Sequence, residues 1–221
     1  MTAKSKQSID EIKQLIIKIG QMLHQKSMLA AYDGNISCRY QDQIIITNSQ
    51  THKAWLTVKD FAIIDLGGKV ISGKPSSEMP MHLKAYTVCD QVKAIIHAHP
   101  VNAISLSIAK PKWSELPANV ISELVIAAGK IPIVPYHLPG SEKLANAIAK
   151  MLPQYKLMIL RRHGSFTWGS DLTEAYIGLE RLEHSATVLL QALMVGKLST
   201  VSKAEFKQLL KIRQTLGDKI I

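Results

Sequence analysis

The segment Ala94-Ile95-Ile96-His97-Ala98-His99 decides the fold, because it is typical of a buried strand that stops at Pro100. Side chains two residues apart in a strand point to the same face, so both imidazoles can reach one ion. A third ligand would complete a site of three protein ligands with one open position. His163, directly after the apolar run 157–160, is the natural candidate. The alternative, that the His-x-His pair has only a core or surface role, stays open.

Further strands and helices are interspersed on both sides of this segment. Ser8 and Glu11 have the spacing of a capping box at the start of the first helix. The other expected strands are 44–47, 62–65, 69–71, 131–135 and 157–160. The first expected helix runs from Ser8 to before Asp33, and the second starts near Ser77. The remaining expected helices are 101–109, 141 to about 151, 172–198 and 203–216. This order predicts one domain, over 1–221, with a central sheet of the α/β or α+β class.

Composition and charge exclude several classes of protein. The 221 residues are 47% hydrophobic and 20% charged, which is typical of a globular chain and not of a disordered, coiled-coil or collagen-like one. There is no run of 18 apolar residues, so we expect no membrane helix. The net charge of +10 comes from scattered lysines without interleaved aromatic residues, which favours a solvated face over nucleic-acid binding. Two cysteines, Cys38 and Cys89, and a polar N-terminus favour a reducing cytoplasm.

Three further segments carry polar groups that suit catalysis or anion binding. Glu78, at a helix start, either compensates the helix dipole or acts as a general base beside a metal. Ser76 and Ser77 are either N-caps or part of a phosphate site at the same helix N-terminus. The stretch 34–37 is either a turn after the first helix or a cradle for an oxygen anion. For His82, one helical turn after Glu78, we expect a structural role.

Taken together and in order, these segments resemble the class II aldolase/adducin family, most closely its L-fuculose-phosphate aldolase type. The resemblance covers roughly residues 8–195. The matching motifs are Gly34-Asn35-Ile36-Ser37-Cys38-Arg39, Ile46-Thr47-Asn48-Ser49, Pro75-Ser76-Ser77-Glu78-Met79-Pro80-Met81-His82, Ile96-His97-Ala98-His99-Pro100 and Arg162-His163-Gly164-Ser165-Phe166-Thr167-Trp168-Gly169.

The resemblance implies a role for each matching position. His97, His99 and His163 would be the ligands of one Zn²⁺ ion per subunit, and Glu78 would be the catalytic acid/base. The substrate phosphate would be held by Asn35, Ser49, Ser76 and Ser77. The implied fold is a three-layer α/β/α sandwich around a mixed sheet, and the implied assembly is a homotetramer. The implied reaction cleaves a phosphorylated ketose to dihydroxyacetone phosphate and an aldehyde, through a metal-stabilised enediolate.

The chain departs from the aldolase pattern at three places. Gln50 stands where the phosphate loop of the fuculose type ends in glycine, which predicts a narrower or differently shaped pocket. Ile121 stands near the position of an active-site tyrosine, and the last tyrosine of the chain is Tyr176, so no tyrosine is available in a C-terminal tail. Tyr136 or His137 could replace the missing proton donor, although we expect packing roles for both.

Other members of the family remain alternatives. Ribulose-phosphate 4-epimerases and methylthioribulose-phosphate dehydratases share the zinc histidines, and Glu78 favours an aldolase or a dehydratase over an epimerase. Adducin-like members serve as non-catalytic binding modules and lack these histidines. The presence of all three therefore argues for an enzyme.

Overall fold

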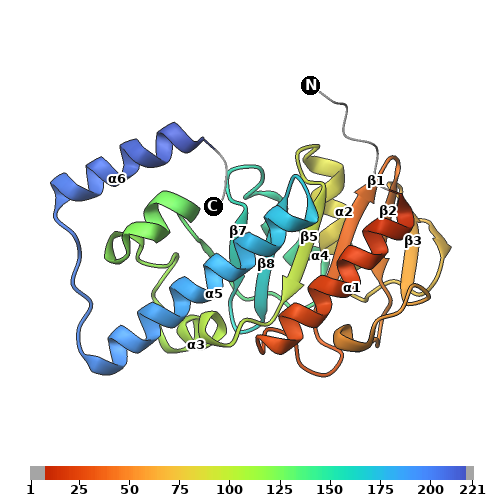
Figure 1. The fold of residues 1–221 in the computed structure, drawn as a ribbon, viewed down its shortest axis with the longest axis horizontal. Helices are drawn as coiled ribbons and strands as arrows, with labels where there is room; N and C mark the ends of the chain where they lie inside the picture. The colour runs from red at the N-terminus through yellow and green to blue at the C-terminus, as the bar shows by residue number, and fades with distance from the viewer. Residues whose placement is uncertain (1–7, 218–221) are drawn as a thin grey trace.

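Alternating side chains along the strands give the central sheet two apolar faces. On strand β2, Ile44 and Ile46 pack on one side with helix α2, whereas Ile45 packs on the other side with helix α1. The computed structural model describes residues 8–217. Within them the sheet has eight strands in the order β4-β3-β2-β1-β5-β8-β7-β6, and of these only the pair β6–β7 is parallel (Figure 1). The strands are β1 (Asn35–Tyr40), β2 (Gln43–Thr47), β3 (Phe61–Asp65), β4 (Val70–Ser72), β5 (Ala94–Ala98), β6 (Ile133–Val134), β7 (Leu157–Leu160) and β8 (Gly164–Gly169).

Helices cover both faces of this sheet. In the view of Figure 1, α1 (Ile9–Gln25) and α5 (Leu172–Val195) lie in front of the strands, and α2 (Met79–Val88) and α4 (Glu142–Ala149) lie behind them. Helix α3 (Val101–Ala109) packs on α5 and on the β7 side of the sheet. The predicted three-layer α/β/α sandwich with a mixed sheet is therefore confirmed. No helix in the described part of the chain is long and apolar enough to span a bilayer.

The last helix, α6 (Lys203–Leu216), lies away from the sheet, and its bounds match the prediction. It packs on η3, a short π-helix over Leu124–Ala128, where Arg213 Nη1 donates to the carbonyl oxygens of Ile126 (3.2 Å) and Ala127 (3.1 Å). None of the α6 residues is buried. Two short 3₁₀ turns, η1 (Lys53–Trp55) and η2 (Ala118–Val120), complete the described elements.

The local signals were correct at the starts of α1 and α4 and incomplete for the sheet. The interpretation of Ser76 and Ser77 as N-caps is wrong, because Glu78 occupies the N-cap position of α2. The capping box of Ser8 and Glu11 forms, and Ser141 caps α4 as predicted. The interpretation of 34–37 as a turn is wrong for most of the segment, because Asn35 begins β1, which pairs with β2 and β5. The alternative interpretation, a cradle for an oxygen anion, stays a prediction, and Gly34 and Asn35 line the cavity described below. Only Gly34 keeps a turn conformation, with φ +70°, and a Cβ there would lie 2.7 Å from the carbonyl oxygen of His97. Strand β8 was not predicted either.

Candidate functional site

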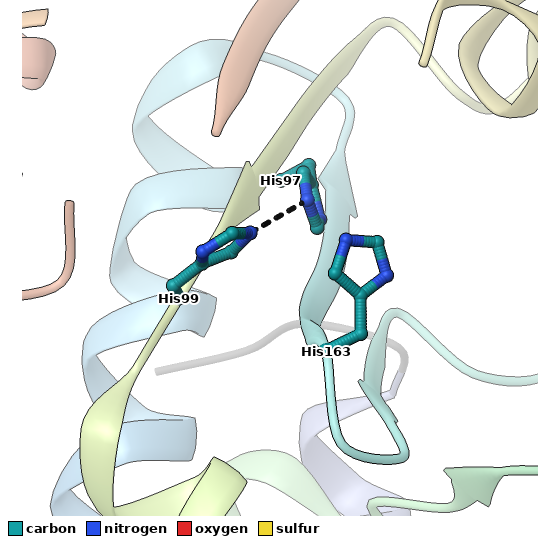
Figure 2. Close-up of side chains that lie close together, drawn as sticks. All are labelled: His97, His99 and His163. Atoms are coloured by element: carbon teal, nitrogen blue, oxygen red, sulfur yellow. Dashed lines mark hydrogen bonds between the residues drawn. The ribbon is translucent and has the colours of Figure 1, made fainter. Parts of the chain in front are cut away.

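His97 on strand β5 and His99, directly after its end, point their Nε2 atoms toward each other. His97 Nδ1 lies 2.7 Å from the carbonyl oxygen of Ser165 on β8, and this acceptor places the ring proton on Nδ1. His99 Nδ1 lies 3.1 Å from Asp33 Oδ2, which fixes the same tautomer. The two Nε2 atoms are therefore unprotonated when the rings are neutral, and they lie 3.2 Å apart. Figure 2 shows the two rings facing each other at the end of β5.

His163 reaches the same point from the turn between β7 and β8. Arg162 takes a left-handed conformation there, with φ +58°, and the backbone N–H of His163 donates to the Leu160 carbonyl at 3.0 Å. Gly164 follows, and a Cβ at that position would lie 2.8 Å from His99 Cδ2 and 3.1 Å from His97 Cε1. Glycine is thus required for the close approach of β8 to the histidines. The His163 ring centroid lies 4.7 Å from that of His97 (Figure 2).

Glu78, at the N-terminal end of α2, lies against two of the three imidazoles. Its Oε2 is 3.0 Å from His97 Nε2, and its Oε1 is 3.1 Å from His163 Nε2. Asn35 Nδ2 donates to Glu78 Oε2 at 3.0 Å and to Ser76 Oγ at 3.2 Å. Ser76 Oγ also accepts the backbone N–H of Glu78 at 3.2 Å. The carboxylate is therefore oriented by Asn35 and by the start of its own helix.

The electrostatics of the cluster depend on the protonation of the imidazoles. Burial raises the pKa of Glu78, but the charge of His97 and hydrogen bonds from His163 and His97 lower it more, so the net pKa is far below the usual range of a carboxyl group. Burial and the neighbouring His97 lower the pKa of His99 to about 4, against the opposing effect of Asp33. If the imidazoles near Glu78 were neutral, burial would remain as the main effect and would raise the pKa of this carboxyl group.

The donor set fits a divalent transition metal. One ligand atom from each of His97, His99 and His163 can be chosen so that all three lie within 4.8 Å of one another. Two imidazole nitrogens on a tetrahedral zinc ion lie about 3.3 Å apart, given Zn–N bonds of about 2.0–2.1 Å. The observed separation of 3.2 Å between the two Nε2 atoms agrees. Among the described residues, His163 Nδ1 and Asn35 Oδ1 are buried without a hydrogen-bond partner. Such atoms are typical of a binding site.

A cavity of about 600 Å³ opens beside this cluster and collects the predicted site residues. Of the eight, seven line it: Asn35, Ser49, Ser76, Ser77, Glu78, His99 and His163. The eighth, His97, is fully buried and contacts the cavity residues Glu78 and His99. The structure thus brings together side chains from five separate stretches of the sequence.

The structure places the residues that depart from the aldolase pattern in different surroundings. Gln50 lines the cavity with φ +58°, so the loop keeps the left-handed backbone that glycine would adopt at this place. The packing role expected for Tyr136 is wrong, because its side chain is 54% exposed. Ile121 is partly buried and packs against the hydrophobic cluster that contains residues of α3 and α5. No tyrosine except Tyr32 lines the cavity within the described part of the chain.

Two charged residues of the cavity were missed by the sequence analysis. Asp33 orients His99, yet it stands in a turn-like Asp-Gly-Asn stretch that carries no catalytic signature. Lys53 also lines the cavity, and no motif in the sequence distinguishes it from the many other lysines of the chain. Behind the site, His82 has the structural role expected for it: its Nδ1 lies 2.7 Å from Ser37 Oγ, which is also 2.8 Å from the hydroxyl of Tyr86.

Known proteins share both the sequence and the fold. The family model for the class II aldolase and adducin N-terminal domain matches residues 14–190. The L-fuculose phosphate aldolase of Methanococcus maripaludis is 36% identical over 170 residues, which cover 77% of this chain and 91% of that protein.

Two further proteins extend the comparison. The 3-oxo-tetronate 4-phosphate decarboxylase of Haemophilus influenzae is 29% identical over 203 residues, with 89% and 95% of the two chains covered. The crystal structure of L-fuculose-1-phosphate aldolase from Thermus thermophilus has a TM-score of 0.76 at 28% identity, and 83% of this chain and 95% of that one are aligned. With the histidine cluster and the three-layer fold already in place, these matches establish that the chain belongs to the class II aldolase and adducin N-terminal domain family.

Proposed function

We propose that the protein is a zinc-dependent aldolase that cleaves a phosphorylated ketose to dihydroxyacetone phosphate and an aldehyde. Family membership and the L-fuculose phosphate aldolase relatives make the chain a lyase. The observation that carries the proposal is the convergence of three imidazoles and one carboxylate, Glu78, on a single cavity. An adducin-like binding module has no use for such a cluster.

The three histidines would hold the ion, and Glu78 would move the proton. His97, His99 and His163 are uncharged ligands, and a bound divalent ion would supply the positive charge that stabilises an anion developing on the substrate oxygens. Glu78, half-buried and held by Asn35, lies beside the ligand nitrogens. From there it can take or give the proton on the carbon or oxygen next to the bond that breaks.

The rest of the cavity offers neutral hydrogen-bonding groups for a phosphate. Ser49, Ser76 and Ser77 lie on two loops that meet there, where the backbone N–H of Ser49 donates to the Lys74 carbonyl at 2.8 Å. The hydroxyls of Ser49 and Ser77 make no hydrogen bond to another residue of the described chain, so both are available to a ligand. Binding energy gained at the phosphate, away from the reacting bond, would position the substrate.

A decarboxylase is the second candidate, because relatives named 3-oxo-tetronate 4-phosphate decarboxylase align with more of this chain than the first-named aldolase does. Decarboxylation was not among the alternatives drawn from the sequence. Both reactions break a carbon–carbon bond and leave negative charge on neighbouring oxygens, so the same cluster suits either. We also propose a homotetramer in the cytoplasm, as the family resemblance implies.

Product analysis of the zinc-loaded protein tests the proposal. Ketose 1-phosphates are supplied as a panel together with 3-oxo-tetronate 4-phosphate, and dihydroxyacetone phosphate and carbon dioxide are measured separately. We expect dihydroxyacetone phosphate from at least one ketose. Glu78→Gln should lower turnover by at least 100-fold while zinc content stays unchanged, because the ligands remain and the acid/base is lost.

Glu142→Gln, at the exposed start of α4, is the matched control and should keep full activity. Carbon dioxide from the tetronate without aldol cleavage would move the assignment to the decarboxylase. Full activity of Glu78→Gln would refute the role given to Glu78.

A further inference from the structure

Lys53 is a buried lysine whose ammonium group lies at the edge of the active-site cavity. The residue is only 2% exposed and stands in η1, against helix α1. A Cβ at Gly20 of α1 would lie 3.4 Å from the Lys53 Cβ, and still closer to the Lys53 carbonyl group. The backbone of Lys53 therefore packs closely against α1, and the residue also lines the cavity.

Two backbone carbonyls fix the ammonium group. Nζ donates to the carbonyl oxygen of Thr51 at 2.6 Å and to that of Tyr32 at 3.0 Å. A lysine ammonium group has three N–H donors, so one remains for a ligand. Both carbonyls are neutral partners, and the positive charge of Lys53 is not cancelled by a direct ion pair in the described structure.

Among the described protein groups around the cavity, Lys53 offers the one full positive charge of a lysine or arginine to an anionic ligand. Of the described residues that line the cavity, two carry carboxylates, Asp33 and Glu78, and Lys53 is the single lysine or arginine. A phosphate dianion would be repelled by both carboxylates, and the serine hydroxyls bring no charge to offset that repulsion. Burial lowers the pKa of Lys53 to about 8, against the opposing effects of Asp33 and Glu78, which leaves the amine mostly protonated at neutral pH.

We infer that Lys53 is the cationic binding residue for the phosphate group of the substrate, to which it donates its third N–H beside Ser49 and Ser77. This inference rests on the proposed phosphorylated substrate and adds the charged contact that the predicted phosphate residues lack. A charge-assisted hydrogen bond in a partly enclosed site is stronger than the neutral hydroxyl contacts. Lys53 is thus the main source of selectivity for phosphorylated over uncharged sugars.

Phosphate binding can be measured without turnover. Inorganic phosphate is titrated calorimetrically into the full-length, metal-loaded protein, into Lys53→Met and into Lys59→Met. Lys59 is an exposed lysine, so the control has the same change of charge outside the cavity. We expect Lys53→Met to bind phosphate at least tenfold more weakly and Lys59→Met to stay within twofold of the unmodified protein. Equal affinity of Lys53→Met and the unmodified protein would overturn the inference.

Metal content separates direct binding from a structural effect. Tyr32 precedes Asp33, which holds His99, so Lys53 could act through this loop instead. Weak phosphate binding by Lys53→Met together with loss of the metal would refute the direct contact. Unchanged metal content supports it, and Lys53→Arg, which keeps the charge, should then bind phosphate more tightly than Lys53→Met.

A second measurement uses the unmodified protein, in case Lys53→Met does not fold. Slow acetylation of lysines is followed by peptide mass spectrometry with and without phosphate. Phosphate should slow the labelling of Lys53 at least fivefold and leave Lys59 unchanged, and equal rates at Lys53 would contradict the inference. The two proposals can fail separately. If phosphate binds through Lys53 but no sugar phosphate is cleaved, the aldolase activity alone is refuted. If a sugar phosphate is cleaved but Lys53→Met binds phosphate as tightly as the unmodified protein, the role of Lys53 alone is refuted.

Discussion

Gly164→Ala should weaken metal binding although it leaves every ligand in place. The added Cβ would lie 2.8 Å from His99 Cδ2 and 3.1 Å from His97 Cε1, and nearer still to the carbonyl oxygen of Ala98. Carbon atoms of real side chains essentially never approach a non-bonded Cβ closer than 3.0 Å and seldom closer than 3.4 Å. Strand β8 or the histidines must therefore move by several tenths of an ångström. Metal–ligand distances tolerate shifts of only about 0.2 Å.

We expect a loss of zinc affinity of at least about tenfold, and a loss of stability of about 1–3 kcal/mol, as is typical of overpacked sites. Zinc affinity is measured by competition with a chromogenic chelator, and stability by urea unfolding of the metal-free protein. Gly196→Ala is the matched control, because a Cβ at Gly196 meets no atom within 4 Å. Zinc affinity of Gly164→Ala within twofold of the unmodified protein would show that the histidines are not held as tightly as the structure indicates.

Two further predictions concern groups around the ligands. Asp33→Asn removes the charge that orients His99 and should lower zinc affinity about 10- to 100-fold in the same chelator assay, and unchanged affinity would mean that the contact of 3.1 Å is incidental. Burial and His97 lower the pKa of His82 to about 3, so the unfolded chain binds a proton there below about pH 6.5 that the folded protein excludes. Stability should therefore fall as the pH falls, by about 1.4 kcal/mol per pH unit from this group. Urea unfolding between pH 6 and 5 gives the change in the free energy of unfolding per pH unit. This change should be smaller by about that amount in His82→Asn than in the unmodified protein, and equal values would contradict the lowered pKa of His82.

The elements that were predicted correctly have strong local signals. Helix α1 carries a capping box and one apolar stripe, and β2 and β7 are runs of apolar residues. Strands β1 and β8 lack such runs, because their inward-facing side chains include Ser37 and Thr167. These polar residues are buried only because β5 lies between the two strands and pairs with both. Pairing between segments far apart in the sequence leaves no periodic pattern in either of them.

The site was predictable to different degrees. The alternation of side chains along one strand places His97 and His99 on the same face, and this needs no knowledge of the fold. The place of His163 after a buried strand and of Glu78 at a helix start made both of them candidates, and the ordered motifs of the family gave each a role. Asp33 and Lys53 escaped prediction because their functional contacts are made across long separations in sequence, from Asp33 to His99 and from Lys53 to the carbonyl of Tyr32.

The five residue pairs between β5 and β8 affect how the protein can lose and regain its metal ion. They belong to the middle of the sheet, and the Ser165 carbonyl that orients His97 is part of the same ladder. The imidazoles are therefore preorganised by a framework that owes its stability to apolar packing on both faces. In many small zinc domains the ion is needed for folding. Here we expect apolar packing to hold the folded state without the ion, so a chelator should strip the protein to a folded, inactive form that regains its activity on re-supply. Which metal occupies the site in a cell would then follow from the ions available, not from the order in which the chain folds and binds.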